Sequence, residues 1–219
     1  MKLNIHRNIF IIVLLCFLEQ AGFSQGFVNL NFESPIPPLP SGPAFMPITN
    51  ALPGWTGYIG GEQVAEVVYN SRALDGAGIS LHSPTSSLQP IQGNYSVLLQ
   101  GARFSSASAA IAQLGQITSS INSLFFLAQN STLQVTFAGQ LIPYFQVNQT
   151  DNYMTFAADI SSFAGQTGEL RFTAPQNSFS FLDGVRFSST VVPEPSIYSL
   201  LGCGVLLFGA ARATFKRRQ

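Results

Sequence analysis

Short runs in which apolar and polar residues alternate recur along the middle of this chain, and they restrict its fold more than any other feature. In residues 132–137 every second position is apolar, with Leu133, Val135 and Phe137 separated by polar residues. Side chains of a strand point alternately to the two faces of a sheet, so this spacing places all three on one face. Comparable runs begin near Phe27 and occupy residues 95–99, 121–127, 153–157, 170–173 and 179–187. Because no long stretch has helical periodicity, we predict an all-β fold, an antiparallel sandwich of two sheets.

Three segments depart from this alternation. Residues 34–54 hold most of the prolines, so we expect an irregular but ordered loop after the first strand. Residues 105–120 are rich in Ala, Ser and Gln and would also suit a helix, but alternation in residues 109–114 favours a strand. Asp159 is placed to begin a single helical turn that Gly165 ends.

The beginning of the chain has the composition of a secretory signal peptide. A basic start precedes an apolar stretch at residues 9–18, and the small residues Gly22 and Ser24 suit a signal-peptidase site. We therefore predict that residues 1–24 are a signal peptide. An uncleaved membrane anchor is the alternative.

The end of the chain combines a stiff motif, an apolar segment and a basic cluster. Pro193, Glu194 and Pro195 favour extended backbone and precede the uncharged residues 197–211. These 15 residues are fewer than the roughly 20 that an untilted span requires, although neighbouring apolar residues can extend them. The basic residues 216–218 belong in the cytoplasm by the positive-inside rule, which leaves the rest of the chain outside. We predict a transmembrane helix here, with a buried core helix as the alternative.

Residues 191–219 as a whole resemble the PEP-CTERM sorting signal of Gram-negative-type bacteria, in which the same motif, apolar helix and basic end follow one another. The resemblance implies an exosortase, a membrane-embedded protease, as partner, and transient anchoring in the inner membrane. It further implies cleavage near the motif and delivery to the cell surface or to the exopolysaccharide matrix of a biofilm. These implications concern where the protein goes and not what it does there.

Residues 25–190 remain as a predicted ectodomain, and their composition excludes several functions. Both cysteines of the chain fall outside this range, so the ectodomain has no disulfide although we expect it to be exported. It has no lysine, and four arginines stand against eight acidic residues, which gives a net charge near −4. Nucleic-acid binding requires a basic surface, so we exclude nucleic acid as a partner.

Enzyme chemistry finds little support in the ectodomain. His82 is its one histidine, and neither a cysteine nor a G-x-S-x-G motif is present, so the common nucleophile arrangements are missing. We interpret His82 as a structural histidine bonded to the backbone. Glu62 and Glu66 have the spacing of an acid pair for glycoside hydrolysis, but a solvated strand edge explains them better. We therefore predict no catalytic residues.

The order of the segments resembles a galactose-binding-like jelly roll, a fold found in carbohydrate-binding modules. The matching segments are residues 31–33, 52–55, 92–97, 159–165, 170–172 and 182–185. In that fold the first and last strands lie close together and often hold a structural calcium ion.

The resemblance implies that Asn31, Glu33 and Asp183 are oxygen ligands of such a calcium ion. The sequence departs from the fuller family pattern at Gly184, where a second acid would stand. The alternative is that Glu33 caps a turn and that Asp183 pairs with an arginine, either Arg171 or Arg186.

Trp55 is the only tryptophan of the chain, and Tyr58 follows three positions later. If both aromatic rings are exposed, they form a ligand-binding platform on which sugar rings can stack. The alternative, which we favour, is that Trp55 anchors the proline-rich loop against the core.

The sequence as a whole predicts a non-catalytic exported protein of the cell surface or extracellular matrix that associates with exopolysaccharide. The first alternative is a carbohydrate-binding module with a defined glycan ligand. A polysaccharide-acting enzyme ranks third.

Overall fold

The computed structural model describes residues 26–130 and 132–192. The predicted signal peptide at residues 1–24, the motif Pro193, Glu194 and Pro195, and the apolar and basic segments after it lie outside these residues. Among the helices of the described part, none has the length and hydropathy that crossing a membrane requires.

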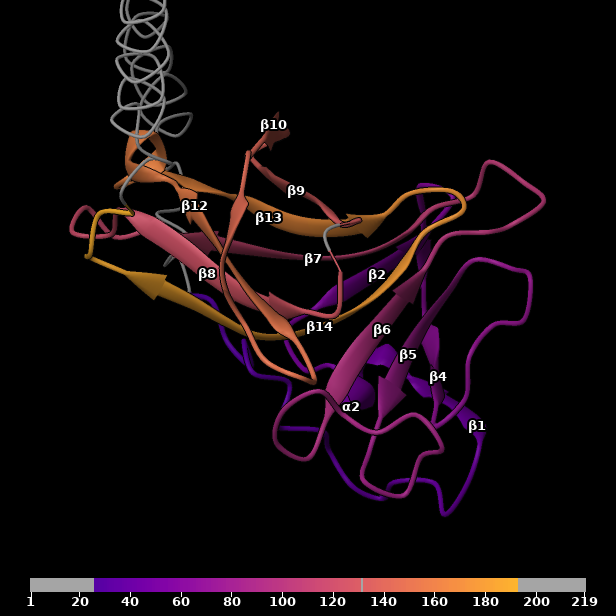
Figure 1. Cartoon of the computed structure of the whole chain (residues 1–219). Helices are drawn as coiled ribbons and strands as arrows, with labels where there is room; N and C mark the ends of the chain where they lie inside the picture. The colour runs from indigo at the N-terminus through magenta and orange to yellow at the C-terminus, as the bar shows by residue number, and fades with distance from the viewer. Residues whose placement is uncertain (1–25, 131, 193–219) are drawn as a thin grey trace, which may run out of the picture.

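In the described residues the strands form two sheets that pack face to face (Figure 1). The strands of the larger sheet, in order across it, are β1 (Ala44–Pro47), β4 (Glu66–Tyr69), β5 (Gly78–His82), β6 (Ser96–Gln100), β14 (Phe179–Ser188), β8 (Ser123–Ala128), β12 (Met154–Asp159) and β11 (Phe145–Gln149). Those of the smaller sheet are β10 (Gln140–Leu141), β9 (Gln134–Phe137), β13 (Thr167–Ala174), β7 (Ala109–Gln116), β2 (Thr56–Ile59) and β3 (Glu62–Val64). The prediction of an all-β, two-sheet sandwich is therefore confirmed. The run that begins near Phe27 is not a strand, because Asn29 and Phe32 have positive φ angles that turn the backbone, and β1 is the first strand of the described residues.

One strand pair differs from the predicted antiparallel arrangement. The strands β4 and β5 run parallel, and residues 70–77 connect them, whereas the other strand pairs of the described residues are antiparallel. Alternation of apolar and polar residues does not reveal this difference, because the direction of a neighbouring strand leaves no period in the sequence.

Short elements complete the sandwich. The strand β7 confirms the strand predicted at residues 109–114. The 3-10 turn η1 (Ser161–Phe163) follows Asp159, whose Oδ1 accepts a hydrogen bond from the Ser161 N–H at 2.8 Å, as the predicted helical turn requires. Residues 34–54 are less irregular than expected, because they contain β1 and the helix α2 (Ile48–Ala51). An edge strand such as β1 tolerates Pro47, and burial of α2 against the core stabilises this single turn.

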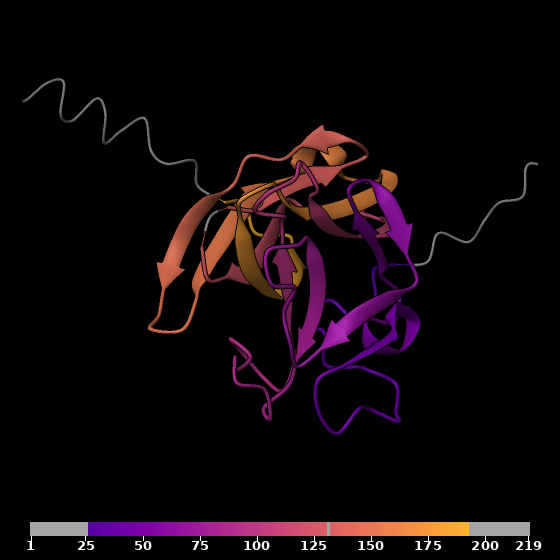
Figure 2. The ribbon, with the colours of Figure 1, turned by 90° about the vertical axis from the view of Figure 1, so that its right-hand side faces the viewer.

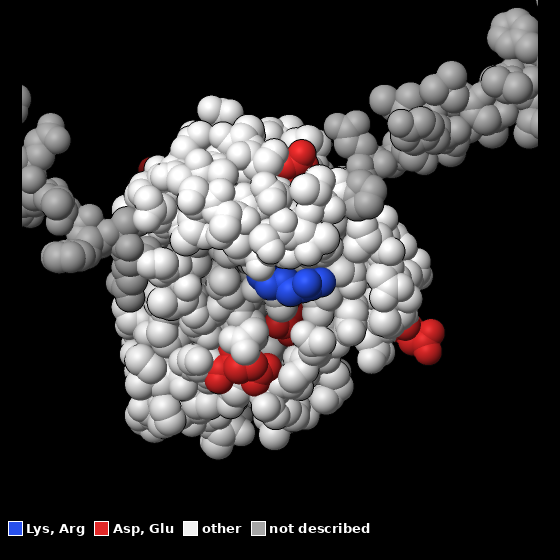
Figure 3. Space-filling model, turned by 90° about the vertical axis from the view of Figure 1, so that its left-hand side faces the viewer, with Lys and Arg blue, Asp and Glu red and all other residues white. Residues whose placement is uncertain are grey.

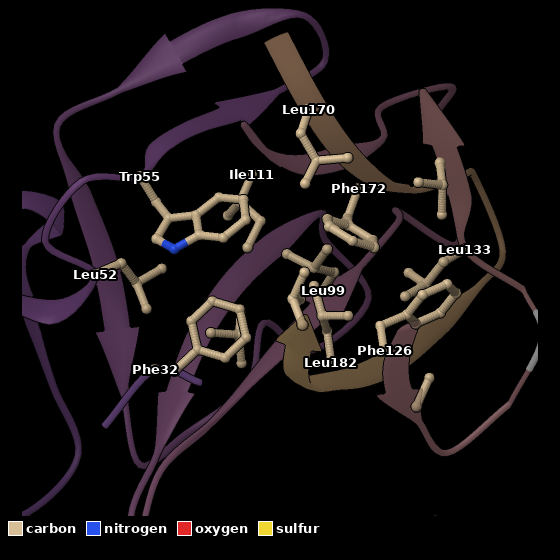
Figure 4. Close-up of a cluster of buried hydrophobic side chains, with 14 of the residues drawn as sticks. Phe32, Leu52, Trp55, Leu99, Ile111, Phe126, Leu133, Leu170, Phe172 and Leu182 are labelled. Atoms are coloured by element: carbon tan, nitrogen blue, oxygen red, sulfur yellow. The ribbon is translucent and has the colours of Figure 1, made fainter. Parts of the chain in front are cut away.

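Aromatic side chains from both sheets fill the space between them (Figure 4). Phe126 of β8 stacks on Phe156 of β12 with ring centroids 5.4 Å apart, and its edge meets Phe172 of β13 across the core at the same distance. Val135 and Phe137 of β9 are fully buried, as the alternation in their segment predicts. Each such ring removes a large apolar area from water, so this cluster is the main source of stability.

A second, smaller apolar cluster lies on the outer face of the larger sheet. Leu98 of β6, Phe181 of β14 and Leu127 of β8 are buried there together with Ile91 from the loop that leads into β6. In Figure 2 this loop and the β11–β12 hairpin lie on the same side of the sheet. The outer face is therefore partly covered by loops, and the uncovered part is where the candidate site lies.

Candidate functional site

Three neighbouring strands of the larger sheet, β5, β6 and β14, align their outward-facing side chains in rows. The residues at alternate positions of these strands, such as Leu99 and Leu182, point into the core, so their neighbours point outward. The three rows are Gly78, Gln100 and Phe179; Ser80, Leu98 and Phe181; and His82, Ser96 and Asp183. We call them the first, second and third rows.

The first row lies in an open cleft of about 1020 Å³. Gln100 and Phe179 pair directly across the two strands, and Phe179 is 56% exposed. Leu98 and Phe181 of the second row form an apolar floor beside them. The walls come from three loops and a hairpin, which contribute residues 72–75, 87–91, 177–178 and 151–152.

Hydrogen bonds to the backbone hold the loop of residues 72–76 against the end of β6. The Nε2 of Gln100 donates to the carbonyl oxygens of Leu74 at 2.7 Å and Gly76 at 3.0 Å. The backbone N–H of Arg103 donates to the carbonyl oxygen of Asp75 at 2.9 Å. This wall of the cleft is thus tied to the sheet at several points, which favours a preformed site.

The charged groups of the cleft balance one another. Arg72 and Arg103 face Asp75 and Asp151 as lining residues, and the Arg103 guanidinium lies 3.6 Å from the Asp75 carboxylate. Arg72 has no ion pair or side-chain hydrogen bond within residues 26–130 and 132–192. Charge is sparse elsewhere too, and Figure 3 shows one face of the molecule on which most of the surface is uncharged.

The third row, in contrast, is covered by the loop of residues 83–95. Asp183 is 2% exposed; its Oδ2 accepts a hydrogen bond from the Ser96 hydroxyl and its Oδ1 one from the Gly184 N–H, both at 2.6 Å. Burial raises the pKa of Asp183 to about 7, and the nearby Glu33 carboxylate adds to this increase. The row is a structural feature closed to ligands.

His82 is buried at the other end of the third row. Its Nδ1 lies 2.7 Å from the Ser86 hydroxyl, and its ring meets the Phe181 ring edge-on at 5.2 Å. Its Nε2 has no hydrogen-bond partner among the described residues. Burial lowers the pKa of His82 to about 4, against a smaller opposing effect of the Leu88 backbone. His82 therefore holds the covering loop, mainly through a side-chain hydroxyl where the sequence suggested the backbone.

Glu33 holds the far end of the same loop. Its Oε1 accepts hydrogen bonds from the backbone N–H groups of Asn94 at 2.7 Å and Tyr95 at 3.1 Å. Gly93, with φ of 61°, lies so close that a Cβ there would collide with the Glu33 carboxylate. The alternative that Glu33 caps a turn is thus confirmed, whereas Asp183 pairs with Ser96 and with neither Arg171 nor Arg186.

The structure brings Glu33 and Asp183 close enough to affect each other electrostatically, as the resemblance implied. However, N–H and O–H donors point at both carboxylates, and the Oδ1 of Asn31 faces the Glu33 N–H at 3.5 Å. Calcium requires six to eight free oxygen ligands. The described residues contain no group of three or more His, Cys, Asp or Glu side chains that could hold a metal ion, and hydrogen-bond donors already point at these oxygens, so calcium binding stays a prediction.

Trp55 is buried, so the proposed aromatic platform is wrong and the anchor alternative holds. The indole is 3% exposed, and its Nε1 donates to the Asn29 carbonyl oxygen at 3.0 Å. Its ring packs beside Phe32 at 5.5 Å, and Figure 4 shows it among core side chains. Tyr58 lies on the smaller sheet, where the Arg171 guanidinium covers its ring at 4.0 Å. The indole combines an apolar body with one donor, and the core satisfies both.

Glu62 and Glu66 do not form an acid pair. Glu62 is in β3 and Glu66 in β4, two strands that belong to different sheets, and both residues are exposed. Their spacing would suit an acid pair only within one continuous element, and the break between β3 and β4 separates them.

Sequence reasoning missed the cleft residues, although one signal for them is present. Leu98-Leu99 and Phe181-Leu182 are consecutive apolar pairs within strands, so both faces of β6 and β14 carry apolar side chains. Such a pair indicates that the second face is covered or used for binding. Gln100 and Arg72 have no comparable signal, because polar residues at strand ends are common.

The chain has no match among protein-family models, and a search of curated proteins finds no significant match. Among solved structures, it is similar to the enzymatically active domain of tailspike protein 4 of bacteriophage CBA120, with 16% identity and a TM-score of 0.35, over 62% of this chain and 19% of that chain. It is also similar to a family 11 carbohydrate-binding module from Clostridium thermocellum in complex with a β-1,3-1,4-mixed-linked tetrasaccharide. That match has 12% identity and a TM-score of 0.36, and covers 68% of this chain and 96% of the module. Similarities this distant identify neither a site nor a ligand.

Proposed function

We propose that the cleft over the first row binds a glycan chain and that the protein binds polysaccharide without cleaving it. The observation that carries this proposal is Phe179, an aromatic side chain held 56% exposed on a strand at the floor of a large polar cleft. A single exposed ring is common on protein surfaces, so the support for a binding role comes from the position of this ring in the cleft, beside apolar and amide side chains.

A sugar ring has an apolar face and a rim of hydroxyl groups, and the cleft offers partners for both. Phe179 and the neighbouring floor provide an apolar surface against which a ring can stack. Amide side chains surround that surface as hydrogen-bonding partners; they belong to Gln89, Gln100, Gln129, Asn152 and Asn177. Apolar walls with a few placed polar groups are typical of binding sites for small molecules and sugar units.

The size of the cleft suits a segment of a polysaccharide chain. Its volume of about 1020 Å³ lies at the upper end of the range of roughly 300–1,000 Å³ for ligand pockets. The resemblance of the segment order to galactose-binding-like jelly rolls points to the same class of ligand.

The acidic side chains support binding more than hydrolysis. Glycoside hydrolysis needs two carboxyl groups facing each other across the bond, one of them a proton donor. Of the two carboxyl groups that line the cleft, Asp75 pairs with Arg103 and Asp151 is exposed on the β11–β12 hairpin, whereas Asp183 with its raised pKa is enclosed under a loop. We therefore propose a non-catalytic role.

Binding can be tested by affinity electrophoresis of the full-length protein, purified in detergent, through gels that contain soluble polysaccharides. We expect retardation by at least one polysaccharide and, in Phe179→Ala, binding weakened about tenfold, the value of one aromatic stacking contact. Phe45→Ala is the matched control, because Phe45 is 73% exposed on β1 of the same sheet but outside the cleft. Equal effects of the two substitutions, or no retardation by any polysaccharide, would contradict the proposal.

We further propose that this sandwich acts outside the cell, after an exosortase has processed the PEP-CTERM-like tail and released the protein from the inner membrane. The support is the sequence of residues 191–219. Cell fractionation and intact-mass analysis test it. We expect Pro193→Ala with Pro195→Ala to leave an uncut protein in the inner membrane. The same mass and location for variant and wild type would contradict exosortase processing.

A further inference from the structure

We infer that the cleft selects neutral, hydroxyl-rich polysaccharides over anionic ones. This inference rests on the proposed glycan binding and concerns which class of glycan the cleft accepts. It follows from the orientation of two amide side chains, Gln89 and Gln100, and from the balance of charges around them.

The amide of Gln100 is fixed with its oxygen as the free atom. Its Nε2 donates both hydrogens to carbonyl oxygens of the 72–76 loop, those of Leu74 and Gly76. Two acceptors on the same atom settle which end of the amide is nitrogen. No described residue donates to the Oε1 of Gln100, so the side chain presents an acceptor, beside the exposed ring of Phe179.

Gln89 has the same arrangement on the opposite wall. Its Nε2 donates to the carbonyl oxygens of Pro84 at 3.1 Å and Ser86 at 2.7 Å, both within its own loop. Its Oε1 likewise has no donor from the described residues. In both loops, backbone carbonyl groups thus accept the two N–H hydrogen bonds of a cleft-lining amide, which leaves the amide oxygen fixed and without a donor.

A fixed acceptor needs a ligand that brings a donor. Sugar hydroxyl groups donate hydrogen bonds, whereas a carboxylate or sulfate group only accepts them and would leave the Oε1 atoms unpaired. An unpaired buried polar group costs more than the bond itself contributes, so the mismatch is penalised.

The charges of the cleft give an anionic chain no net attraction. Arg72 and Arg103 are matched in number by Asp75 and Asp151, and Arg103 is already paired, so Arg72 is the one cleft arginine without an ion pair among the described residues. The ectodomain as a whole has a net charge near −4, which repels a polyanion at long range. A neutral polysaccharide needs no net charge attraction from the cleft and is not repelled by the net charge of the ectodomain.

Matched pairs of polysaccharides test this inference. A panel of neutral glucans, mannans and galactans is compared with the same polymers after oxidation of their C6 hydroxymethyl groups to carboxylates, with the full-length protein as the binding partner. We expect at least one neutral polymer to bind, its oxidised form to bind about tenfold more weakly or worse, and the neutral complex to change less than about twofold between low and high salt.

The outcomes separate this inference from the proposed function. Tighter binding of an oxidised polymer, lost in high salt, would overturn the inference and leave glycan binding intact. Binding of no member of any pair would overturn both.

A variant pair tests the fixed acceptor itself. Gln100→Met keeps the length of the side chain but removes its Oε1, together with the two Nε2 bonds that hold the 72–76 loop, and we expect the neutral polymer to bind about fivefold more weakly. Gln63→Met is the control, because Gln63 is an exposed amide on β3 of the smaller sheet and does not line the cleft. Thermal unfolding confirms that both variants fold. Equal effects of the two substitutions, or a gain in neutral binding by Gln100→Met, would overturn the role of Gln100.

Discussion

The first and third rows of the larger sheet lie on the same three strands and the same face, yet their environments are opposite. The first row leaves Phe179, a large apolar side chain, 56% exposed, whereas the third row encloses the carboxyl group of Asp183 at 2% exposure. Both placements are costly by the usual rules of burial. The position of a residue in the sheet therefore does not determine its environment. The loop of residues 83–95 determines it, because this loop covers the third row and forms one wall of the cleft above the first row.

The two rows also differ in how they satisfy their polar atoms. In the third row the protein supplies partners from within, through Ser96, Gly184 and Ser86. In the first row the Oε1 of Gln100 has no hydrogen-bond partner among the described residues. We therefore expect the stability of the protein to depend on the third row and the proposed glycan binding to depend on the first.

The strongest test uses the two buried titratable groups of the third row, whose contributions to stability oppose each other. Folding raises the pKa of Asp183 from 3.8 to about 7, so between these values only the unfolded state has lost the proton, and stability falls as pH rises. Folding lowers the pKa of His82 from 6.5 to about 4, so between these values stability rises with pH.

We therefore expect the two contributions to cancel largely in the wild type and to be revealed by substitution. In His82→Asn the free energy of unfolding should fall by about 4 kcal/mol from pH 4 to pH 7, and in Asp183→Asn it should rise by about 3 kcal/mol from pH 4 to pH 6.5. Urea unfolding followed by the fluorescence of Trp55, the only tryptophan, measures both. Identical pH profiles of unfolding free energy in the two variants would show that titration of His82 and Asp183 does not determine how stability depends on pH.

The next test compares two phenylalanines of β14 that are two residues apart on the same face. Phe181→Ala should lower the free energy of unfolding by about 3 kcal/mol, because it empties the buried second row. Phe179→Ala should lower it by less than about 0.5 kcal/mol, because the ring is already half in water. Chemical denaturation of both variants gives the comparison, and similar losses would mean that Phe179 is a packing residue.

We expect a smaller loss of stability from a substitution at Gly93, where the Glu33 carboxylate contacts the covering loop of residues 83–95. Gly93→Ala combines backbone strain at φ of 61° with a collision against the Glu33 carboxylate, and should cost about 2 kcal/mol. Gly61→Ala is the matched control, because Gly61 has φ of 93° with open space around it, so that its substitution costs the strain alone, about 1 kcal/mol. Denaturation midpoints separate the two costs. Equal losses would show that the contact with Glu33 adds nothing.

The smallest expected effect is that of calcium. Because hydrogen-bond donors already occupy the oxygens of Glu33 and Asp183, millimolar calcium should leave the melting temperature unchanged in calorimetry. An increase of several degrees that chelation reverses would show that these carboxylates exchange their donors for the ion.

The sequence allowed the strands to be predicted well and the site poorly, for physical reasons. Burial against a sheet has a period of two residues, so alternation revealed Val135 and Phe137 as core residues without any knowledge of their partners. The cleft depends on the register between β6 and β14, which pairs Gln100 with Phe179 across nearly eighty residues of chain. A register of this kind leaves no local trace.

Side chains with two possible roles were the hardest to assign. Trp55 suits a sugar platform and a core anchor equally in composition, and only the carbonyl of Asn29 beside its nitrogen decides between them. Glu33 and Asp183 were expected together from the resemblance, but most of the donors that contact them come from residues 94–96, which the sequence does not connect with either.

The parallel pairing of β4 and β5 has a consequence for how the proposed binding specificity can change. A loop that closes a hairpin can be trimmed to a few residues, but a parallel connection has to return along a full strand before the next one begins. Residues 70–77 make that return and carry Arg72 and Asp75 to the cleft. Connectivity therefore guarantees this wall a minimum length while leaving its exposed side chains free to vary. Related chains would be expected to diversify their ligands there by substitution and to resist deletion.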